Sequence, residues 1–226
     1  MEIRWLGHSA FEIISDDNVK ILIDPFISNN PACQVPVEEL NPDIILITHG
    51  HSDHFGDALE ISNSTNAPIA CIHEISLFLA KQGIRNIGVN IGGSFIFRNI
   101  KFTMLDAKHS SDIDIVEEIT PGGSAASFLI TFEDGTKVFH AGDTGLFGDM
   151  KDIIGDKFTM GPFEAALASM WLNPKAVIPM HYNTFPPIEQ DPAVFANFVS
   201  QFNPNIDVVV MNPDEYFEYN PEDYQD

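Results

Sequence analysis

The sequence predicts a layered α/β domain in which mixed strands are followed by helices on the outside. Two observations support this prediction. Short apolar runs rich in β-branched residues recur between residues 3 and 139, and helix-like segments alternate with the later runs. Hydrophobic residues make up 44% of the chain and charged residues 19%, so neither a disordered nor a fibrous protein is expected.

Nine apolar runs are predicted as strands because each is short and bounded by turn-prone residues. They are Ile3–Leu6, Phe11–Ile14, Val19–Ile23, Ile44–Ile47, Ile69–Ile72, Phe95–Phe97, Phe102–Leu105, Phe128–Phe132 and Val138–Phe139. The early runs are separated by small pieces such as Ser-Asp-Asp-Asn at residues 15–18. Antiparallel hairpins are therefore expected at the start of the chain.

Five segments are predicted as helices: Ala58–Ser62, Ile75–Gln82, Gly148–Ile154, Phe163–Trp171 and Pro192–Phe202. The length of 226 residues suits one larger α/β domain, and no internal repeat or low-complexity linker divides the chain. We therefore expect one domain over residues 1–226. The tail from residue 212, rich in Asp, Glu, Asn and Tyr, is expected to be mobile at its end.

The charge balance restricts the partners. Eleven basic and 33 acidic residues give a formal net charge of −22, which opposes non-specific contact with nucleic acid or an anionic membrane. An anionic small molecule is not excluded, because bound metal ions reverse the local field at short range. The expected partner is a small-molecule substrate, without nucleic acid or membrane, and a homo-oligomer stays open.

The chain has only two cysteines, Cys33 and Cys71. This number argues against a disulfide framework and fits a reducing compartment. The start of the chain has no basic segment followed by a long apolar stretch, and no apolar run has the length of a membrane span. We therefore expect a cytoplasmic protein.

The most informative segment is Thr-His-Gly-His-Ser-Asp-His at residues 48–54, directly after the apolar run Ile44–Ile47. In a continuing strand, His49 and His51 would point the same way, while small residues let the chain turn and present Asp53 and His54. Imidazole and carboxylate donors suit zinc, and also manganese, nickel or iron. The alternative interpretation is a polar surface turn.

Three further residues follow apolar runs, where strand ends converge: His109, Asp143 and His181. Taken singly, each is better explained as a hydrogen-bonded surface or core residue than as a metal ligand. Because a metal site needs ligands from several elements at one sheet edge, their shared position favours a common metal cavity.

The order and spacing of these residues resemble the signature of the metallo-β-lactamase superfamily. Four further segments resemble its branch of uncharacterised metal-dependent hydrolases related to L-ascorbate-6-phosphate lactonases. They are Leu-Gly-His-Ser at 6–9, Ile-Asp-Pro-Phe at 23–26, Ala-Gly-Asp-Thr-Gly at 141–145 and Met-His-Tyr at 180–182. The resemblance covers nearly the whole chain and implies a four-layered αββα sandwich with metals at one edge.

The resemblance also implies a ligand set for two metal ions. It assigns one ion to His49, His51 and His109, a second ion to Asp53, His54 and His181, and the bridging position to Asp143 with a hydroxide. Such a site leaves open coordination positions, as a catalytic metal requires. Asp24 is expected to brace the histidine turn as a hydrogen-bond acceptor.

Other polar residues support weaker hypotheses. His8 is either a catalytic residue on the substrate side of the cavity or a buried hydrogen-bonded histidine. His73 and His140 are expected to be structural, with His140 pointing away from Asp143. Lys157 and Thr159 are candidates for contact with an anionic substrate, the alternative being a solvated loop.

One segment departs from the superfamily pattern. Relatives carry an apolar strand after the helix that follows the bridging aspartate, and residues 150–161 are too few to hold a helix end, a strand and a loop. Loss of an inner strand leaves neighbouring ladder groups unpaired. We therefore favour omitted residues over a true deletion in a stable fold.

The resulting hypothesis is a dinuclear metal-dependent hydrolase in which a bridging hydroxide attacks a small, anionic ester, lactone or phosphoester. Asp53 would orient the hydroxide and accept its proton, and metal-bound water or His8 would protonate the leaving group. His51 favours hydrolysis, since superfamily members with iron redox chemistry usually carry a carboxylate at that place. Substrate choice is expected to depend on loops 26–37, 110–124 and 155–162.

Two alternatives stay open. One is a phosphodiesterase or RNA-processing nuclease of the same superfamily, against which the acidic charge counts because phosphate contacts need Lys and Arg. The other is a non-catalytic metal-binding sensor or interaction module. A full set of ligands with open positions counts against it.

Overall fold

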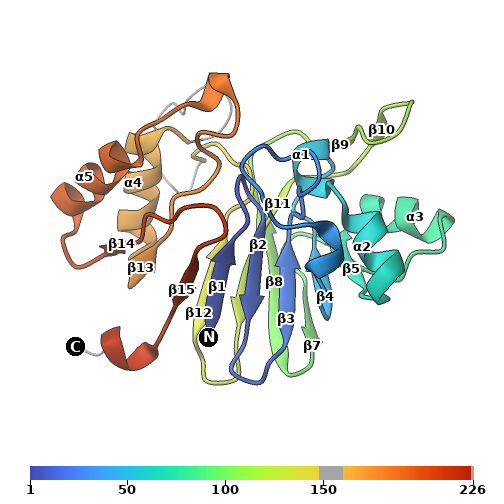
Figure 1. Cartoon of the computed structure of the whole chain (residues 1–226), viewed down its shortest axis with the longest axis horizontal. Coiled ribbons are helices and arrows are strands. Elements are labelled where there is room, and N and C mark those ends of the chain that lie inside the picture. The colour runs from blue at the N-terminus through green and yellow to red at the C-terminus, as the bar shows by residue number, and fades with distance from the viewer. Residues whose placement is uncertain (148–159, 225–226) are drawn as a thin grey trace.

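The computed structural model describes residues 1–147 and 160–224. Two sheets stand next to each other in the middle of the molecule, with α2 and α3 on one side and α4 and α5 on the other (Figure 1). This mixed α/β architecture confirms the predicted fold class. The helix predicted over residues 148–154, and Lys157 and Thr159, lie outside the described residues.

The larger sheet has seven strands in the order β15-β1-β2-β3-β4-β5-β6. Their bounds are β1 Glu2–Trp5, β2 Phe11–Ile14, β3 Lys20–Ile23, β4 Ile44–Leu46, β5 Ile69–Ile72, β6 Asn86–Val89 and β15 Tyr216–Glu218. The first three strands pair antiparallel, which confirms the predicted hairpins, and β3 to β6 pair parallel. The parallel strands therefore all end at the same edge of the sheet.

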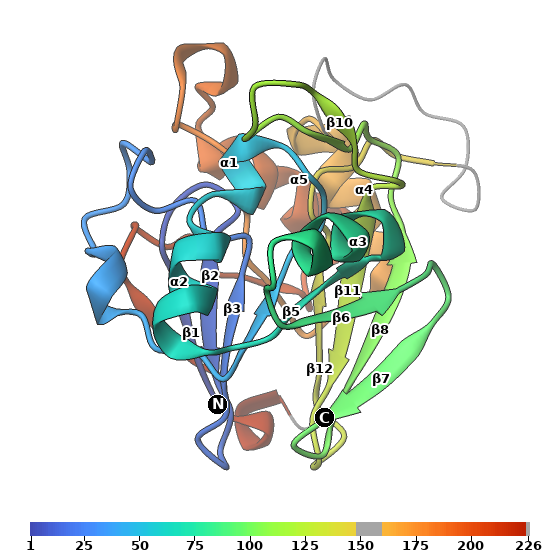
Figure 2. The same cartoon turned by 90° about the vertical axis from the view of Figure 1, so that its right-hand side faces the viewer.

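The second sheet has four strands in the order β12-β11-β8-β7, all antiparallel. Their bounds are β7 Ser94–Phe97, β8 Ile100–Asp106, β11 Ala126–Thr131 and β12 Lys137–His140. Because β8 and β12 both pair antiparallel with β11, they run in the same direction and end at one edge. Figure 2 shows the two sheets nearly edge-on.

Two small two-stranded sheets complete the β structure. One joins β9 Asp112–Ile113 to β10 Thr120–Pro121, and the other joins β13 Ala176–Val177 in parallel to β14 Asp207–Val208. The pair β13–β14 is separate from the four-stranded sheet, which ends at β12. The short segment identified in the sequence lies between β12 and β13 along the chain, and its residues 148–159 are outside the described residues.

The described helices are short. They are α1 Ser52–Phe55, α2 Ala58–Thr65, α3 His73–Lys81, α4 Pro162–Leu172 and α5 Pro192–Phe202, with 3-10 turns at Val37–Glu39, Pro186–Ile188 and Pro221–Tyr224. None of them, in the part of the chain that the structure describes, has the length and apolar character to cross a membrane.

The main core fills the space between the two sheets. Leu22 and Ile45 from the larger sheet and Phe102 and Phe128 from the second sheet are fully buried in one hydrophobic cluster. A smaller cluster joins α4, α5 and β13–β14 around Ala166, Phe195, Val199 and Ile206. Six of the seven predicted ligands follow strands of the two main sheets, so packing of the main core sets their relative positions, whereas His181 follows β13.

Candidate metal centre

The histidine turn leaves the end of β4 and leads into α1. The strand ends at Leu46, before the histidines, so the chain turns here rather than continuing as a strand. The turn itself brings them together: His49 Nε2 lies 3.0 Å from His51 Nδ1. A Cβ atom at Gly50 would lie 2.6 Å from the carbonyl oxygen of Asp112, so the turn packs directly on the backbone of β9.

His109, in the loop after β8, joins the first two histidines. Its ring lies 5.0 Å from that of His49 and 5.1 Å from that of His51, measured between centroids. One nitrogen of each of the three histidines lies within 4.8 Å of the others. This first group can hold one metal ion with nitrogen donors.

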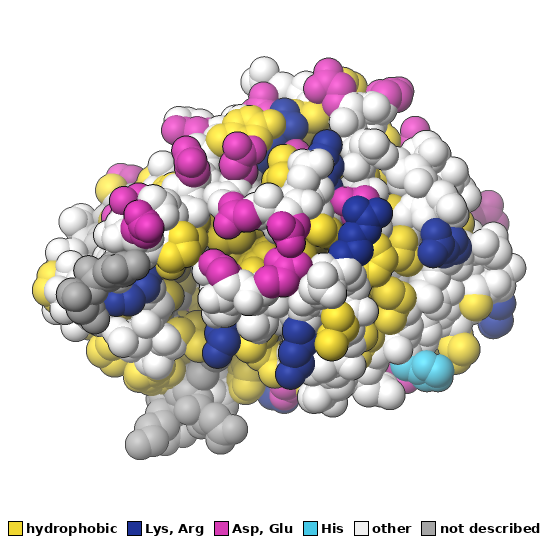
Figure 3. Space-filling view, turned by 90° about the horizontal axis from the view of Figure 1, so that it is seen from below, with side chains coloured by type: hydrophobic (Ala, Val, Ile, Leu, Met, Phe, Trp, Pro, Cys, Tyr) yellow, Lys and Arg dark blue, Asp and Glu magenta, His cyan; other side chains and the backbone are white. Residues whose placement is uncertain are grey.

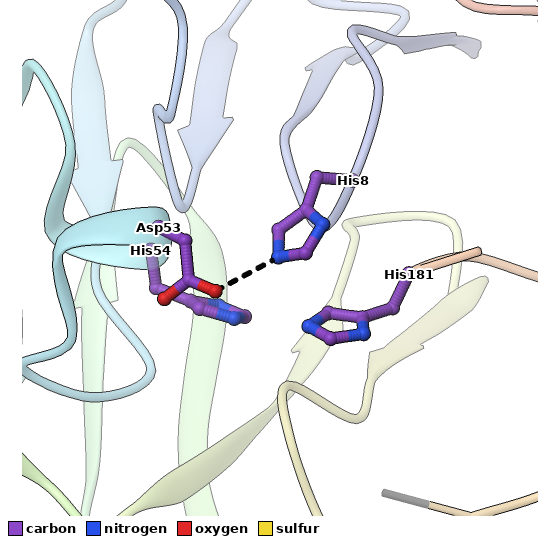
Figure 4. Close-up of side chains that lie close together, drawn as sticks. All are labelled: His8, Asp53, His54 and His181. Atoms are coloured by element: carbon purple, nitrogen blue, oxygen red, sulfur yellow. Dashed lines mark hydrogen bonds and ion pairs between the residues drawn. The ribbon is translucent and has the colours of Figure 1, made fainter. Parts of the chain in front are cut away.

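A second group lies beside the first and contains His8, Asp53, His54 and His181, whose ligand atoms are also within 4.8 Å of one another. Figure 4 shows the four side chains pointing toward a common space. They come from four places in the chain: the turn after β1, two positions of α1, and the loop after β13. His8 therefore lies among the proposed ligands of the second ion.

Asp143, after β12, contacts both groups. Its Oδ1 lies 3.2 Å from His54 Nε2, and its Oδ2 lies 3.2 Å from His181 Nε2 and 3.6 Å from His109 Nε2. Asp143 thus lies between the two groups, where the family resemblance implied a bridging ligand. Within the described residues, four buried atoms here have no hydrogen-bond partner: His54 Nε2, Asp143 Oδ1, His181 Nδ1 and His181 Nε2. Unpaired buried donors and acceptors that converge are what a metal ion would satisfy.

Asp24 lies behind the cluster, fully buried. Its Oδ1 accepts the Thr48 N–H at 2.8 Å, and its Oδ2 accepts the Thr48 hydroxyl at 2.7 Å, His54 Nδ1–H at 2.8 Å and the Ser9 hydroxyl at 3.2 Å. The His54 bond leaves Nε2 free to face Asp143. The geometry is that of the brace expected from the sequence.

The electrostatics of the cluster favour a cation. Burial lowers the pKa of His49 to about 2, and burial also lowers the pKa of His109, so their nitrogens carry free lone pairs at neutral pH. Burial opposes the charge of His54, yet Asp143 and Asp24 outweigh it and raise the pKa of His54 well above the usual range. A metal ion bound at His54 Nε2, the nitrogen that faces Asp143, would take the place of the proton there.

The two histidines predicted to be structural lie outside the cluster of metal ligands. His140 is buried; its Nε2–H donates to the Ser9 carbonyl at 3.1 Å, and its Nδ1 accepts the Gly142 N–H at 3.2 Å. Both ring nitrogens are therefore occupied, and His140 is confirmed as structural. His73 is exposed at the start of α3.

The sequence interpretation missed several neighbours. Thr184 Oγ1 lies 3.0 Å from His8 Nδ1, and Phe185 places its ring beside that of His8. Ser110 Oγ lies 3.2 Å from His51 Nε2. Ser110 belongs to loop 110–124, and Phe26, whose ring also contacts that of His8, belongs to loop 26–37. Both loops were expected to form the walls of the cavity. Thr184 and Phe185 have no signal in the sequence beyond following His181 within four residues.

Comparison with known proteins finds close relatives. A UPF0173 metal-dependent hydrolase of Methanobrevibacter smithii is 76% identical over 239 aligned residues, which cover 100% of both chains. Its namesake from Methanosphaera stadtmanae is 52% identical and covers 96% of this chain and 100% of its own length. The solved structure of Igni18, a metallo hydrolase from Ignicoccus hospitalis, is 38% identical, covers 97% of this chain and 99% of its own, and has a TM-score of 0.84.

The first alignment bears on the expectation that residues are omitted from this chain. It spans 239 positions against the 226 residues of this chain, a difference of 13, so it contains 13 positions at which this chain has no residue. That number is enough for a strand and its turn. The comparison therefore supports the expectation that this chain lacks residues which relatives have.

The metallo-β-lactamase superfamily model matches residues 3–181, which include all seven predicted metal ligands, His8 and Asp24. With the relatives above, this match shows that the chain belongs to the metallo-β-lactamase superfamily.

Proposed function

We propose that the protein is a dinuclear metal-dependent hydrolase acting on a small ester, lactone or phosphoester. The observation that carries the proposal is the place of Asp143, which contacts both donor groups: His54 and His181 of one group and His109 of the other. A purely structural metal site uses four closed ligands around one ion. Two adjacent groups that share a carboxylate are instead typical of catalytic pairs of ions. The names of the relatives support the same reaction class.

In this proposal His49, His51 and His109 hold one ion, Asp53, His54 and His181 hold the other, and Asp143 contacts both. When bound, two divalent ions, zinc first from the donor set and manganese, nickel or iron as alternatives, supply Lewis-acid polarisation of the scissile group and ionisation of water. Asp24 fixes the ring of His54 from behind.

Asp53 is the acidic side chain at the open side of the cluster, with 35% of its side chain exposed. His8 Nε2 lies 3.2 Å from Asp53 Oδ2, and burial lowers the pKa of His8 to about 4, so its ring is neutral at pH 7. A neutral ring with an ionised partner at Nε2 donates there and accepts the Thr184 hydroxyl at Nδ1. His8 thus orients Asp53. We propose that one of the two Asp53 carboxylate oxygens accepts the proton released when water attacks the substrate.

Within the described residues, negative charge on the substrate would be met by the ions rather than by side chains. Lys108, next to His109, forms an ion pair with Asp106. Lys20, Lys101 and Lys137 lie at the starts of β3, β8 and β12, at the edge opposite the candidate ligands. A nuclease would need a basic track for phosphates, so a small-molecule substrate fits better.

The experiment measures metal content of protein purified without added metal, and hydrolysis of a p-nitrophenyl phosphodiester and of a lactone before and after chelation. We expect close to two ions per chain and turnover that chelation abolishes. Asp143→Asn should lower both, whereas His73→Gln, an exposed histidine away from the cluster, should change neither. No bound or rebindable metal would overturn the proposal, and two ions without turnover would favour the sensor alternative.

A further inference from the structure

Two aromatic side chains stand at the His8 side of the candidate metal centre. The ring of Phe185 lies 5.6 Å from that of His8 and meets it edge-on, and the ring of Phe26 lies 5.7 Å from it in the same manner. The two phenylalanine rings are 6.2 Å apart. Phe26 is 7% exposed and Phe185 is 36% exposed, so Phe185 forms the accessible part of this pair.

Both rings are held by their own loops. Asp57 Oδ2 accepts the Ile27 and Ser28 N–H groups at 2.8 and 2.9 Å, and the Asn30 side chain donates to the Phe26 carbonyl at 3.0 Å. The Phe26 N–H also donates to the Asp24 carbonyl at 2.7 Å, so the backbone is fixed on both sides of Phe26. An apolar wall on fixed loops loses little conformational entropy when a ligand packs on it.

Phe185 is fixed by a different loop. It precedes a 3-10 turn that begins with two prolines, and the Ile188 N–H donates to its carbonyl at 3.0 Å. The residue before it, Thr184, is buried and hydrogen-bonded to His8. The Phe185 ring is therefore positioned relative to His8, and through His8 relative to Asp53.

The distribution of charge agrees with an apolar contact here. Figure 3 shows the molecule from the edge opposite the metal centre, where both acidic side chains and Lys and Arg side chains are spread over the surface. Beside His8, by contrast, the contacts are aromatic rings, Thr184 and the proposed ligands. A charged substituent on this side of a substrate would meet no side-chain cation among those contacts.

We propose that Phe26 and Phe185 form a specificity-determining wall, which packs against the part of the substrate that does not react and selects a flat apolar group there. The inference rests on the proposed function, since the substrate's reacting group would be held by the ions. The wall narrows the proposed substrate class to an ester, lactone or phosphoester that carries an aryl or similar apolar substituent on the His8 side.

The test uses two phosphonates with the same metal-binding group, phenylphosphonate and methylphosphonate, titrated calorimetrically into metal-loaded protein. An aromatic contact is worth up to about tenfold in affinity, so we expect phenylphosphonate to bind about ten times more tightly. Phe185→Ala should reduce that ratio to about two to three and leave methylphosphonate binding unchanged. Phe185→Leu should keep an intermediate ratio, because an apolar surface remains.

Phe163→Ala is the matched control, because Phe163 on α4 is 40% exposed and is paired with Phe198 and Phe202. This variant should keep the ratio of the unchanged protein. Two results would overturn the wall while the metal site stands. In one, methylphosphonate binds in a chelator-sensitive manner and phenylphosphonate binds no more tightly. In the other, Phe185→Ala leaves the ratio of the two affinities unchanged. If neither phosphonate binds, the proposed function fails and the wall fails with it.

Discussion

The buried carboxylate of Asp24 shows how single residues organise this site. It accepts four hydrogen bonds from three residues, and its backbone has a positive φ of 45°. Non-glycine residues seldom adopt such a φ, and Asp and Asn do so at least cost. The strand end, the positive φ and the acceptor role therefore select the same residue type.

Replacing Asp24 with Asn tests this role with little backbone change, because Asn tolerates the same φ. The amide keeps one acceptor oxygen but presents an NH₂ group toward donors, so His54 loses its fixed partner. We expect metal affinity to fall about 10- to 100-fold, measured by competition with a chromophoric chelator. Asp57→Asn, which alters hydrogen bonds to two loop N–H groups, should leave metal affinity within error. Equal losses in both variants would contradict the role.

The two cysteines should differ in reactivity. Cys71 is buried and its pKa is raised strongly by burial, while Cys33 is half-buried and burial raises its pKa to a smaller extent. Since the thiolate is the reactive form, a raised pKa means less thiolate at a given pH. We expect one thiol per folded chain to react with Ellman's reagent, at a rate that keeps increasing as the pH passes the ordinary thiol value of 9.0. Two thiols should react after denaturation. Fast labelling of two in the folded protein would show that β5 is not buried as described.

At the scale of elements, α1 depends on the glycine that ends it. Gly56 has a φ of 45°, and a Cβ atom there would lie 2.6 Å from the Phe26 Cα. Because α1 carries Asp53 and His54, a displaced helix moves two proposed ligands. The close approach of α1 to the loop after β3 therefore couples the fold to the site.

Gly56→Ala should cost about 2–6 kcal/mol of stability, combining backbone strain with overpacking, and should weaken metal binding. Gly83→Ala is the control: Gly83 also has a positive φ, of 75°, but a Cβ there meets nothing within 4 Å. It should cost only about 1–2 kcal/mol and leave metal affinity unchanged. Urea unfolding and metal titration of both variants give the comparison, and a similar cost for the two would exclude the packing explanation.

Elements with their own apolar pattern were predictable from the sequence. The predicted bounds of β2, β5 and α5 agree with the structure, and the other predicted strands differ only at their ends. In contrast, the two-residue strands β9, β10, β13 and β14 were missed, and so were β6 and β15. Strand β6 contains Gly88, and β15 lies in an acidic tail, where pairing of Phe217 with Ile3 forms the strand. Such a strand depends on a partner more than 200 positions away, which no local pattern reveals.

The site was predictable to a similar degree. Ligands that follow apolar runs could be found because strand ends meet at one edge, and the structure brings all seven together with His8. The sequence could not predict that His8 Nε2 faces Asp53, or that the Phe185 ring lies beside His8. Their positions follow from turns with positive φ at His8, His181 and Asn183, which depend on long-range contacts.

At the scale of the whole molecule, the described residues form two cores of unequal size. The main core contains fully buried residues of both sheets, whereas the smaller core is centred on Ala166, Phe195, Val199 and Ile206. The strand pair beneath α4 and α5 has only two residues per strand. Regions with few buried apolar contacts open at lower free energy than the rest of a domain. The unit of α4, α5, β13 and β14 should therefore open first.

Amide hydrogen exchange tests this expectation. Amides of α4 and α5 should exchange through openings of lower free energy than those of β4 and β11. Phe195→Ala, which removes a side chain that is 5% exposed, should destabilise the small unit by about 3–5 kcal/mol and speed exchange there alone. Phe128→Ala, in the main core, should speed exchange throughout. Equal acceleration in β4 by Phe195→Ala would mean that the two cores unfold as one.

Metal loading should connect the two cores, because the proposed ligand His181 follows β13 of the small unit while His54 and Asp143 follow strands of the main sheets. The His181 N–H donates to the His8 carbonyl at 3.1 Å, and Thr184 Oγ1 lies 3.0 Å from His8 Nδ1, so hydrogen bonds also join these segments. An ion that binds only the closed arrangement stabilises it by about 2.7 kcal/mol at a free concentration of 100 times its Kd. Exchange of α4 and α5 amides should therefore slow when metal is added and recover after chelation. His181→Ala should remove this protection of the small unit while leaving exchange in β4 and β11 as it is, which distinguishes a metal bridge from a general gain in stability.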